Sequence, residues 1–281
     1  MRFVNKLGMI KKNYFLYKNY LYWGLKKLFF FNKNFRSKKY VKQFYNNSRK
    51  QINVNDLNFN EFIFGKSALN NKRNILYKNE IYFDNIYKPT LYRYGLLNKF
   101  IKNRLSLGEY VLDIGCGWGS ATLYLAKHNP KINFIGIDLS EESVKIANIG
   151  KKKFNIKNVN FFKNDISNKL NLRNKINLTY TVNVLEQLQN NLKKILLNIF
   201  GLNSKYIVFY EPDLYLMKND LIGKISRLRS YRQNKLQNLL PIIHKINNEY
   251  KIYNIVSARN TKIAVNPFNS SSEIILKNSK F

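Results

Sequence analysis

Residues 110–119 constrain the fold more than any other part of this chain. The short apolar run 110–114 is typical of a strand that is buried in a parallel sheet. It leads directly into Gly115, Gly117 and Gly119, at a point where a tight turn from strand to helix leaves little room for a Cβ atom. The segment therefore predicts the first strand, loop and helix of a nucleotide-binding α/β domain.

Apolar strand-like runs and helical runs alternate after this segment, which predicts βαβ units and a parallel sheet. The expected strands are 110–114, 133–137, 159–162, 176–182, 206–210, 252–258 and 273–276. The expected helices are 120–127, 140–153, 188–200 and 234–250, the last of them stopped or kinked near Pro241. We expect an α/β fold with a Rossmann-like, doubly wound, mostly parallel seven-stranded sheet. Its last two strands are antiparallel, and a helical N-terminal extension precedes it.

Two features separate this loop from the loops that bind dinucleotides, namely the acidic residue before it and the spacing of its glycines. Asp113 precedes the first glycine, and the glycines follow the spacing Gly-x-Gly-x-Gly instead of Gly-x-Gly-x-x-Gly. A carboxylate at this place repels a pyrophosphate and favours a cationic cofactor such as S-adenosyl-L-methionine, which carries a sulfonium and an ammonium group. Asp138 ends the next expected strand, where its carboxylate can accept hydrogen bonds from a ribose.

Five segments of the chain resemble the class I S-adenosylmethionine-dependent methyltransferases, in the order in which that family carries them. Residues 112–119 resemble its motif I, residues 136–140 its second motif and residues 164–166 its third. Residues 184–188 and Glu211-Pro212 are similar to the segments that follow its fourth and fifth strands. The resemblance implies an S-adenosyl-L-methionine-dependent methyltransferase domain near residues 105–215.

The resemblance also implies a set of cofactor contacts. The residues concerned are Asp113, Gly115, Cys116, Gly117, Gly119, Asp138, Leu139, Asp165, Ile166 and Asn183. The glycine loop, Asp113 and Asn183 are expected near the methionine moiety. Asp138 is expected to hold the ribose hydroxyls. Asp165 is expected to accept from the adenine amino group, with Leu139 and Ile166 beside the ring.

A catalytic group and an acceptor pocket are less well defined by the sequence. Glu186 is our candidate catalytic carboxylate, because it follows the fourth strand at the mouth of the fold. Gln187 stands where the family often has histidine, so no base is identified by the resemblance. Tyr82, Tyr87 and Tyr92 are candidates for the roof of a substrate cavity, and ordinary packing is the alternative for them.

The acceptor is expected to be a small molecule, a glycan or a lipid-linked compound. The segment after the fourth strand is Asn183-Val184-Leu185-Glu186 and not the Asn- or Asp-Pro-Pro-aromatic segment of enzymes that methylate a flipped base. Two alternatives stay open. One is an RNA methyltransferase that uses its basic N-terminal segment as an electrostatic arm, and the other is a non-catalytic scaffold of the same fold.

The formal net charge of +33 suggests an anionic partner, either RNA or a membrane surface. Most of the basic residues are lysine, and lysine, asparagine and isoleucine are all encoded by A/T-rich codons, so genome composition explains much of this charge. We expect no metal site, and no transmembrane span, because no apolar run reaches the roughly 18 residues that a membrane helix needs. The single cysteine favours a reducing, cytoplasmic location.

Three parts of the chain are expected from these patterns. Residues 1–55 form a basic aromatic extension without any acidic residue, residues 56–103 form a helical lid or substrate segment, and residues 104–281 form the Rossmann-like methyltransferase domain. Three interpretations of the extension compete: an organellar targeting segment, a segment that contacts an anionic membrane, and a helical lid. An organellar location is the alternative if the first interpretation is right.

Overall fold

A computed structural model describes residues 53–281, apart from residues 79, 189–190, 218, 233–237 and 268. The interpretations of the basic extension therefore lie almost entirely outside the described residues. The centre of the fold is a seven-stranded sheet of order β5-β4-β3-β6-β7-β9-β8. Its strands are β3 (Tyr110–Ile114), β4 (Asn133–Asp138), β5 (Val159–Lys163), β6 (Leu178–Val182), β7 (Tyr206–Glu211), β8 (Tyr253–Asn260) and β9 (Ser272–Asn278).

The five strands β3 to β7 are parallel, and β9 lies antiparallel between β7 and β8. The predicted fold class is confirmed, including the antiparallel final pair. The strand order reverses between β4 and β6 at β3, which places the glycine loop at the point of the sheet where doubly wound folds bind their ligands.

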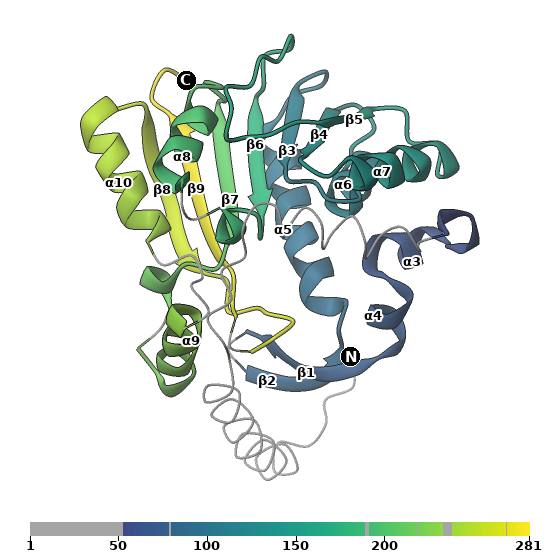
Figure 1. The fold of residues 1–281 in the computed structure, drawn as a ribbon, viewed down its shortest axis with the longest axis horizontal. Helices are drawn as coiled ribbons and strands as arrows, with labels where there is room; N and C mark the ends of the chain where they lie inside the picture. The colour runs from purple at the N-terminus through teal and green to yellow at the C-terminus, as the bar shows by residue number, and fades with distance from the viewer. Residues whose placement is uncertain (1–52, 79, 189–190, 218, 233–237, 268) are drawn as a thin grey trace.

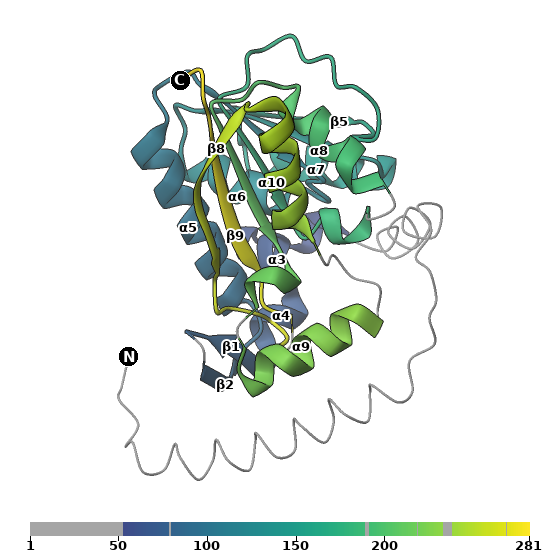
Figure 2. The same cartoon turned by 90° about the vertical axis from the view of Figure 1, so that its left-hand side faces the viewer.

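Two hydrophobic cores hold the helices on the two faces of the sheet (Figure 2). Successive residues of β3 point to opposite faces, so Val111 packs in one core and Leu112 in the other. The first core also receives side chains from α3 (Phe59–Phe64), α5 (Lys88–Arg104), α6 (Ser120–His128) and α7 (Glu141–Lys153). The second receives them from α8 (Leu192–Phe200) and α10 (Leu239–Tyr250).

The predicted start of α7 at Ser140 is correct. The Ser140 hydroxyl accepts a hydrogen bond from the backbone N–H of Ser143 at 3.2 Å, and Glu141 and Glu142 lie in the first turn. Both features stabilise the positive end of a helix dipole. The C-terminal helix differs from the prediction, because α10 begins only at Leu239 and Pro241 lies in its first turn. A proline there removes no helical hydrogen bond, so the helix continues past it.

Several short elements gather at the carboxyl ends of the parallel strands (Figure 1). The strands β1 (Lys72–Tyr77) and β2 (Glu80–Asn85) form a hairpin within the segment that we expected to be a helical lid. The backbones of Leu76 and Ala264 exchange two hydrogen bonds of 2.9 and 3.0 Å, which join this hairpin to the loop between β8 and β9. The helix α9 (Leu221–Arg232) lies at the same end of the molecule.

One lysine of α7 forms hydrogen bonds with the start of the described chain. The Nζ atom of Lys153 donates to the carbonyl oxygens of Val54, Asn55 and Leu57 at 2.8, 2.7 and 2.5 Å. We expect the Lys153→Met variant to lose about 1–2 kcal/mol of unfolding free energy, because these carbonyls lose a charged donor. Urea unfolding followed by circular dichroism measures the loss. Lys152→Met, at the exposed neighbouring position, serves as the control, and equal unfolding midpoints for the two variants would contradict this account.

Candidate functional site

The glycine loop after β3 has the geometry that its sequence predicts. Gly115, Gly117 and Gly119 have φ angles of +72°, +57° and +81°, which residues with a Cβ atom rarely adopt. A Cβ atom on Gly115 would lie 2.4 Å from Cγ2 of Val184, and one on Gly119 would lie 2.8 Å from the ring of Phe161. The loop is therefore bare backbone, closely packed against the segment after β6 and against β5.

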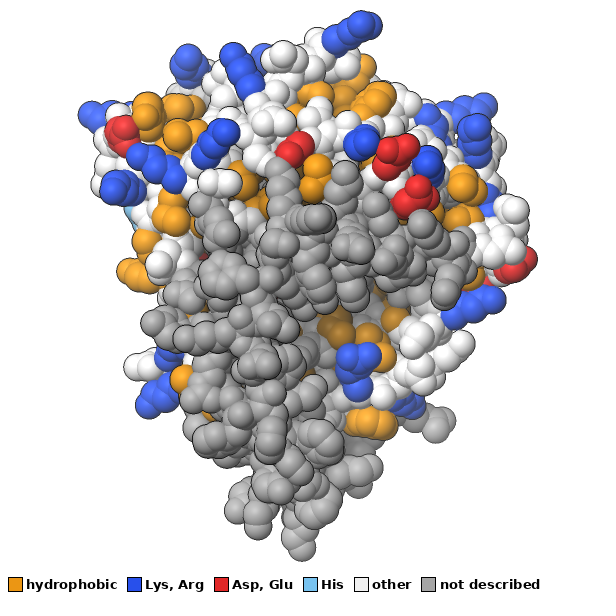
Figure 3. Space-filling view, viewed as in Figure 1, with side chains coloured by type: hydrophobic (Ala, Val, Ile, Leu, Met, Phe, Trp, Pro, Cys, Tyr) orange, Lys and Arg blue, Asp and Glu red, His pale blue; other side chains and the backbone are white. Residues whose placement is uncertain are grey.

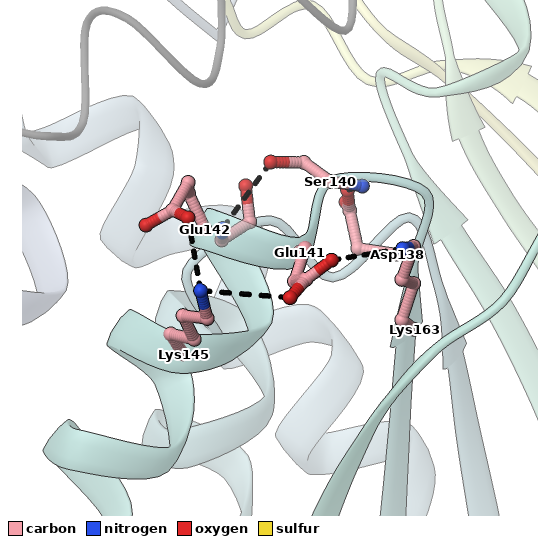
Figure 4. A network of polar contacts seen from close by, with 7 residues as sticks. Asp138, Ser140, Glu141, Glu142, Lys145 and Lys163 are labelled. Atoms are coloured by element: carbon pink, nitrogen blue, oxygen red, sulfur yellow. Dashed lines mark hydrogen bonds and ion pairs between the residues drawn. The ribbon is translucent and has the colours of Figure 1, made fainter.

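The carboxylate of Asp138 is fixed over this loop. Its Oδ2 atom accepts from the backbone N–H of Gly117 at 2.8 Å, and its Oδ1 atom accepts from the backbone N–H of Ser140 at 2.8 Å. Each oxygen can accept a second hydrogen bond. Lys163 pairs with Glu141 at 2.9 Å, within a surface network at the start of α7 (Figure 4).

Asp113 lies behind the loop and is only 2% exposed. Its Oδ2 atom accepts from the Thr122 hydroxyl at 2.6 Å and from the Tyr180 hydroxyl at 2.8 Å, which ties β3 to α6 and β6. Burial raises the pKa of Asp113 to about 7, and the charge of Asp138 adds to this shift. The arrangement shows Asp113 organising the core behind the loop, while its closeness to a bound cofactor stays a prediction.

The raised pKa of Asp113 predicts how its replacement changes stability with pH. Because the folded protein holds this proton more tightly than an unfolded chain does, the stability that protonation contributes is complete below about pH 4 and is lost as the pH rises to about 7. Asp113→Asn keeps an oxygen for both hydroxyl donors and has no charge to bury. We expect the unfolding free energy of the variant, relative to that of the wild type, to be higher at pH 8 than at pH 5. Urea midpoints measured at both pH values check this, and an unchanged difference would contradict it.

The residues predicted to hold adenine follow β4 and β5, whose pairing brings Asp138 opposite Lys163. The Oδ1 atom of Asp165 accepts from the backbone N–H and from the hydroxyl of Ser167, at 3.0 and 2.5 Å. Ile166 is buried in the second core, whereas Leu139 is partly exposed. The structure thus brings Asp138, Leu139 and Asp165 to one edge of the sheet, and their contacts with adenine stay predictions.

The segment after β6 connects the glycine loop to the end of β7. Asn183 has a φ angle of +55° and donates from its backbone N–H to the carbonyl of Tyr210 at 3.0 Å. The next residue, Val184, packs over Gly115 and donates from its backbone N–H to Oε1 of Glu211 at 2.9 Å. This places the predicted residue Asn183 next to the residue that packs on the glycine loop, and Glu186 follows two residues after that.

Two charged residues at this edge were not assigned a role from the sequence. Glu211 is only 1% exposed, and burial raises its pKa to about 7, with the negative charge of Glu186 contributing. Arg93, from α5, lies close enough to Glu211 and Glu186 for their charges to interact. The position of Glu211 at the end of the fifth parallel strand was a usable signal. Nothing in the sequence around Arg93 indicates its place.

The three candidate tyrosines do not form a single group. The ring of Tyr77 lies 6.3 Å from that of Tyr82 and 5.5 Å from that of Tyr92, so the hairpin and α5 share one aromatic cluster. Tyr87 packs instead against Phe64, at 5.4 Å. A substrate role for any of them stays a prediction.

The sheet order, the glycine loop and the acids at the strand ends define the class I methyltransferase fold. A family model described as "Methyltransferase domain" matches residues 105–264. The chain belongs to this methyltransferase family, and it has the fold of the class I S-adenosyl-L-methionine-dependent enzymes.

Solved structures and curated sequences agree with this assignment. Magnesium protoporphyrin IX methyltransferase from Synechocystis, solved with bound S-adenosylmethionine, has a TM-score of 0.59 and 16% identity, and the match covers 89% of this chain and all of that one. Release factor glutamine methyltransferase of Buchnera aphidicola is 46% identical over 83 residues, which are 30% of this chain and 29% of that protein. Malonyl-[acyl-carrier protein] O-methyltransferase of Bacillus anthracis is 34% identical over 93 residues, or 32% of each chain. The matches span about a third of these two curated relatives.

No described helix is both long enough and apolar enough to cross a membrane. In the same part of the chain, no three His, Cys, Asp or Glu side chains come together in a way that could hold a metal ion.

Proposed function

We propose that this enzyme methylates a small organic acceptor that binds at the carboxyl ends of β6 and β7. The observation that carries the proposal is the position of Glu211 and Arg93 next to the segment that packs over the glycine loop. Charged groups from α5 and from the sheet thus converge beside the cofactor loop. Such a convergence of a few polar groups is typical of a small-molecule site.

The cofactor is proposed to lie along the edge from β5 to β6. The positive φ angles of the glycine loop and its close contacts fit a ligand that approaches the bare backbone. Asp138 is fixed by two backbone donors and keeps acceptor capacity on both oxygens, which fits two ribose hydroxyls. Asp165 is proposed to hold the adenine amino group, and Asn183 to lie at the methionine end.

S-adenosylmethionine supplies an activated methyl group on a sulfonium. The protein's contribution to such an in-line displacement is mainly to hold the acceptor atom close and aligned, which accounts for roughly 7–11 kcal/mol in favourable systems. Val184 and Asn183 set the distance between the glycine loop and the end of β7, since they contact both. Alignment of the acceptor would therefore depend on this short segment.

The elements beyond the strand ends favour an enclosed acceptor. The β1–β2 hairpin is bonded to the loop between β8 and β9, and both lie at this end of the molecule with α9 (Figure 1). On the described part of the face in Figure 3, basic side chains are dispersed among acidic and apolar ones and form no continuous stripe.

The test uses S-adenosylmethionine with a radiolabelled methyl group. The full chain is incubated separately with bulk RNA, a protein fraction and a metabolite extract from one bacterial culture. We expect label in the metabolite fraction, in material that resists ribonuclease and protease. Label that becomes soluble only after ribonuclease treatment would contradict the proposed acceptor class and favour the RNA alternative.

A further inference from the structure

We propose that Glu211 and Arg93 together bind a hydroxyl group of the acceptor, and that Glu211 takes up its proton during methyl transfer. The inference rests on the proposed function and adds to it the chemical class of the acceptor, an alcohol or phenol. It also replaces Glu186, the carboxylate favoured from the sequence, as the proton acceptor.

One of the two carboxylate oxygens of Glu211 is already hydrogen-bonded within the fold. Its Oε1 atom accepts from the Thr181 hydroxyl at 2.8 Å and from the backbone N–H of Val184 at 2.9 Å. Its Oε2 atom is fully buried and has no hydrogen-bond partner in the described part of the chain. An unsatisfied buried acceptor is costly, so this atom requires a donor when the site is in use.

In the part of the chain that the structure describes, Arg93 has a donor atom without an acceptor, whereas Glu211 has an acceptor atom without a donor. The Nη1 atom of Arg93 is buried and finds no acceptor among the described residues, although Glu211 and Glu186 are near enough to act on its charge. Burial lowers the pKa of this guanidinium, and the two carboxylates oppose that shift. A buried donor without an acceptor and a buried acceptor without a donor thus belong to two side chains whose charges interact.

A hydroxyl group satisfies both atoms at once, because it donates one hydrogen bond and accepts others. An ammonium group offers no acceptor to Arg93. A carboxylate offers no donor to Glu211, and it would meet the negative charges of Glu211 and Glu186. The two glutamates thus select against an anionic acceptor, while Arg93 selects against a cationic one.

The site lies where proton uptake is useful. Val184 contacts both Gly115 and Glu211, so the end of β7 is one residue away from the cofactor loop. The acceptor oxygen forms its bond to the methyl carbon, the carbon–sulfur bond breaks with its electron pair on sulfur, and the hydroxyl proton passes to Oε2 of Glu211. Among the described residues, the charges that act on Glu211 come from Arg93 in α5 and from Glu186 in the segment after β6. Burial raises the pKa of Glu211 to about 7, which suits a base at neutral pH.

The test compares three probes that share a benzene ring, namely phenol, benzoate and benzylamine, which carry a hydroxyl, a carboxylate and an ammonium group at neutral pH. Their binding to the full chain, loaded with S-adenosylhomocysteine, is measured by ligand-observed NMR. We expect phenol to bind most tightly, and Glu211→Gln and Arg93→Gln each to weaken it about tenfold or more. Phenol affinity of the wild type should rise between pH 6 and pH 8 as Glu211 loses its proton, and that of Glu211→Gln should not.

Two controls separate this inference from the cofactor assignment and from misfolding. Arg104→Gln changes an exposed arginine at the end of the same helix and should leave phenol binding unchanged. Calorimetry should show S-adenosylhomocysteine binding within twofold of wild type in all three variants. Phenol binding that is unaffected by Glu211→Gln and Arg93→Gln, preference for benzoate, or no phenol binding by the loaded wild type would overturn the inference. Failure of the wild type to bind S-adenosylhomocysteine would overturn the proposed function itself.

Discussion

Replacing Asp138 with asparagine should weaken S-adenosylmethionine binding by about tenfold to a hundredfold and leave the fold intact. A hydrogen bond to a charged group contributes about 1.5–3 kcal/mol, and the variant loses the charge on the group proposed to hold the ribose. The asparagine oxygen can still accept from the backbone N–H of Gly117, so the loop keeps its main support. Isothermal titration calorimetry measures the loss.

The matched control for Asp138→Asn is Glu142→Gln. Glu142 lies four residues further along the chain, in the first turn of α7, and its ion pair with Lys145 is at the surface. Surface pairs contribute little, so this variant should bind the cofactor like the wild type. Equal affinities of the Asp138→Asn and Glu142→Gln variants for the cofactor would contradict the proposal that Asp138 binds the ribose.

Replacing Gly115 with alanine should cost about 2–5 kcal/mol of unfolding free energy and abolish measurable cofactor binding. The new Cβ atom would lie 2.4 Å from Cγ2 of Val184, and the φ angle of +72° strains any residue other than glycine. Overpacking of this kind costs about 1–3 kcal/mol, and the left-handed backbone adds about 1–2 kcal/mol. Urea unfolding and calorimetry give the two readouts.

Gly95 provides the contrast for Gly115→Ala. It lies in α5 with no atom within 4 Å of an added Cβ, so Gly95→Ala should stabilise the protein by about 0.5–1 kcal/mol. Adding Val184→Ala to Gly115→Ala should recover part of the lost stability, because the main steric obstacle is removed. A Gly115→Ala variant as stable as the wild type would contradict the packing described for the loop.

The parts of the fold that the sequence predicted depend on local patterns. The glycine loop, the strand end at Asp138 and the N-cap at Ser140 all follow from spacing between β3 and the start of α7. The extra hairpin was not predicted, since Tyr77 and Glu80 are joined by a turn that contains no glycine. Its partner, Ala264, is far away in the sequence.

In the candidate site, too, local patterns were predictable from the sequence and long-range contacts were not. Asp113 was predicted as a carboxylate beside the cofactor, and the structure gives it hydroxyl partners from Thr122 and Tyr180. Tyr180 comes from a strand 67 residues later, so a motif read along the chain does not reveal that burial. The charge of Arg93, from a helix that precedes the whole sheet, interacts with that of Glu211 at the end of β7, and only the packing of α5 reveals this.

A crystal structure of the chain with S-adenosylhomocysteine tests the central claim most directly. We predict the ribose hydroxyls within hydrogen-bonding distance of the Asp138 carboxylate. The homocysteine portion should lie against the backbone of Gly115 and Gly117, and the sulfur should face the segment between β6 and Glu211. A ligand bound elsewhere, or an Asp138 carboxylate turned away from the ribose, would contradict the account.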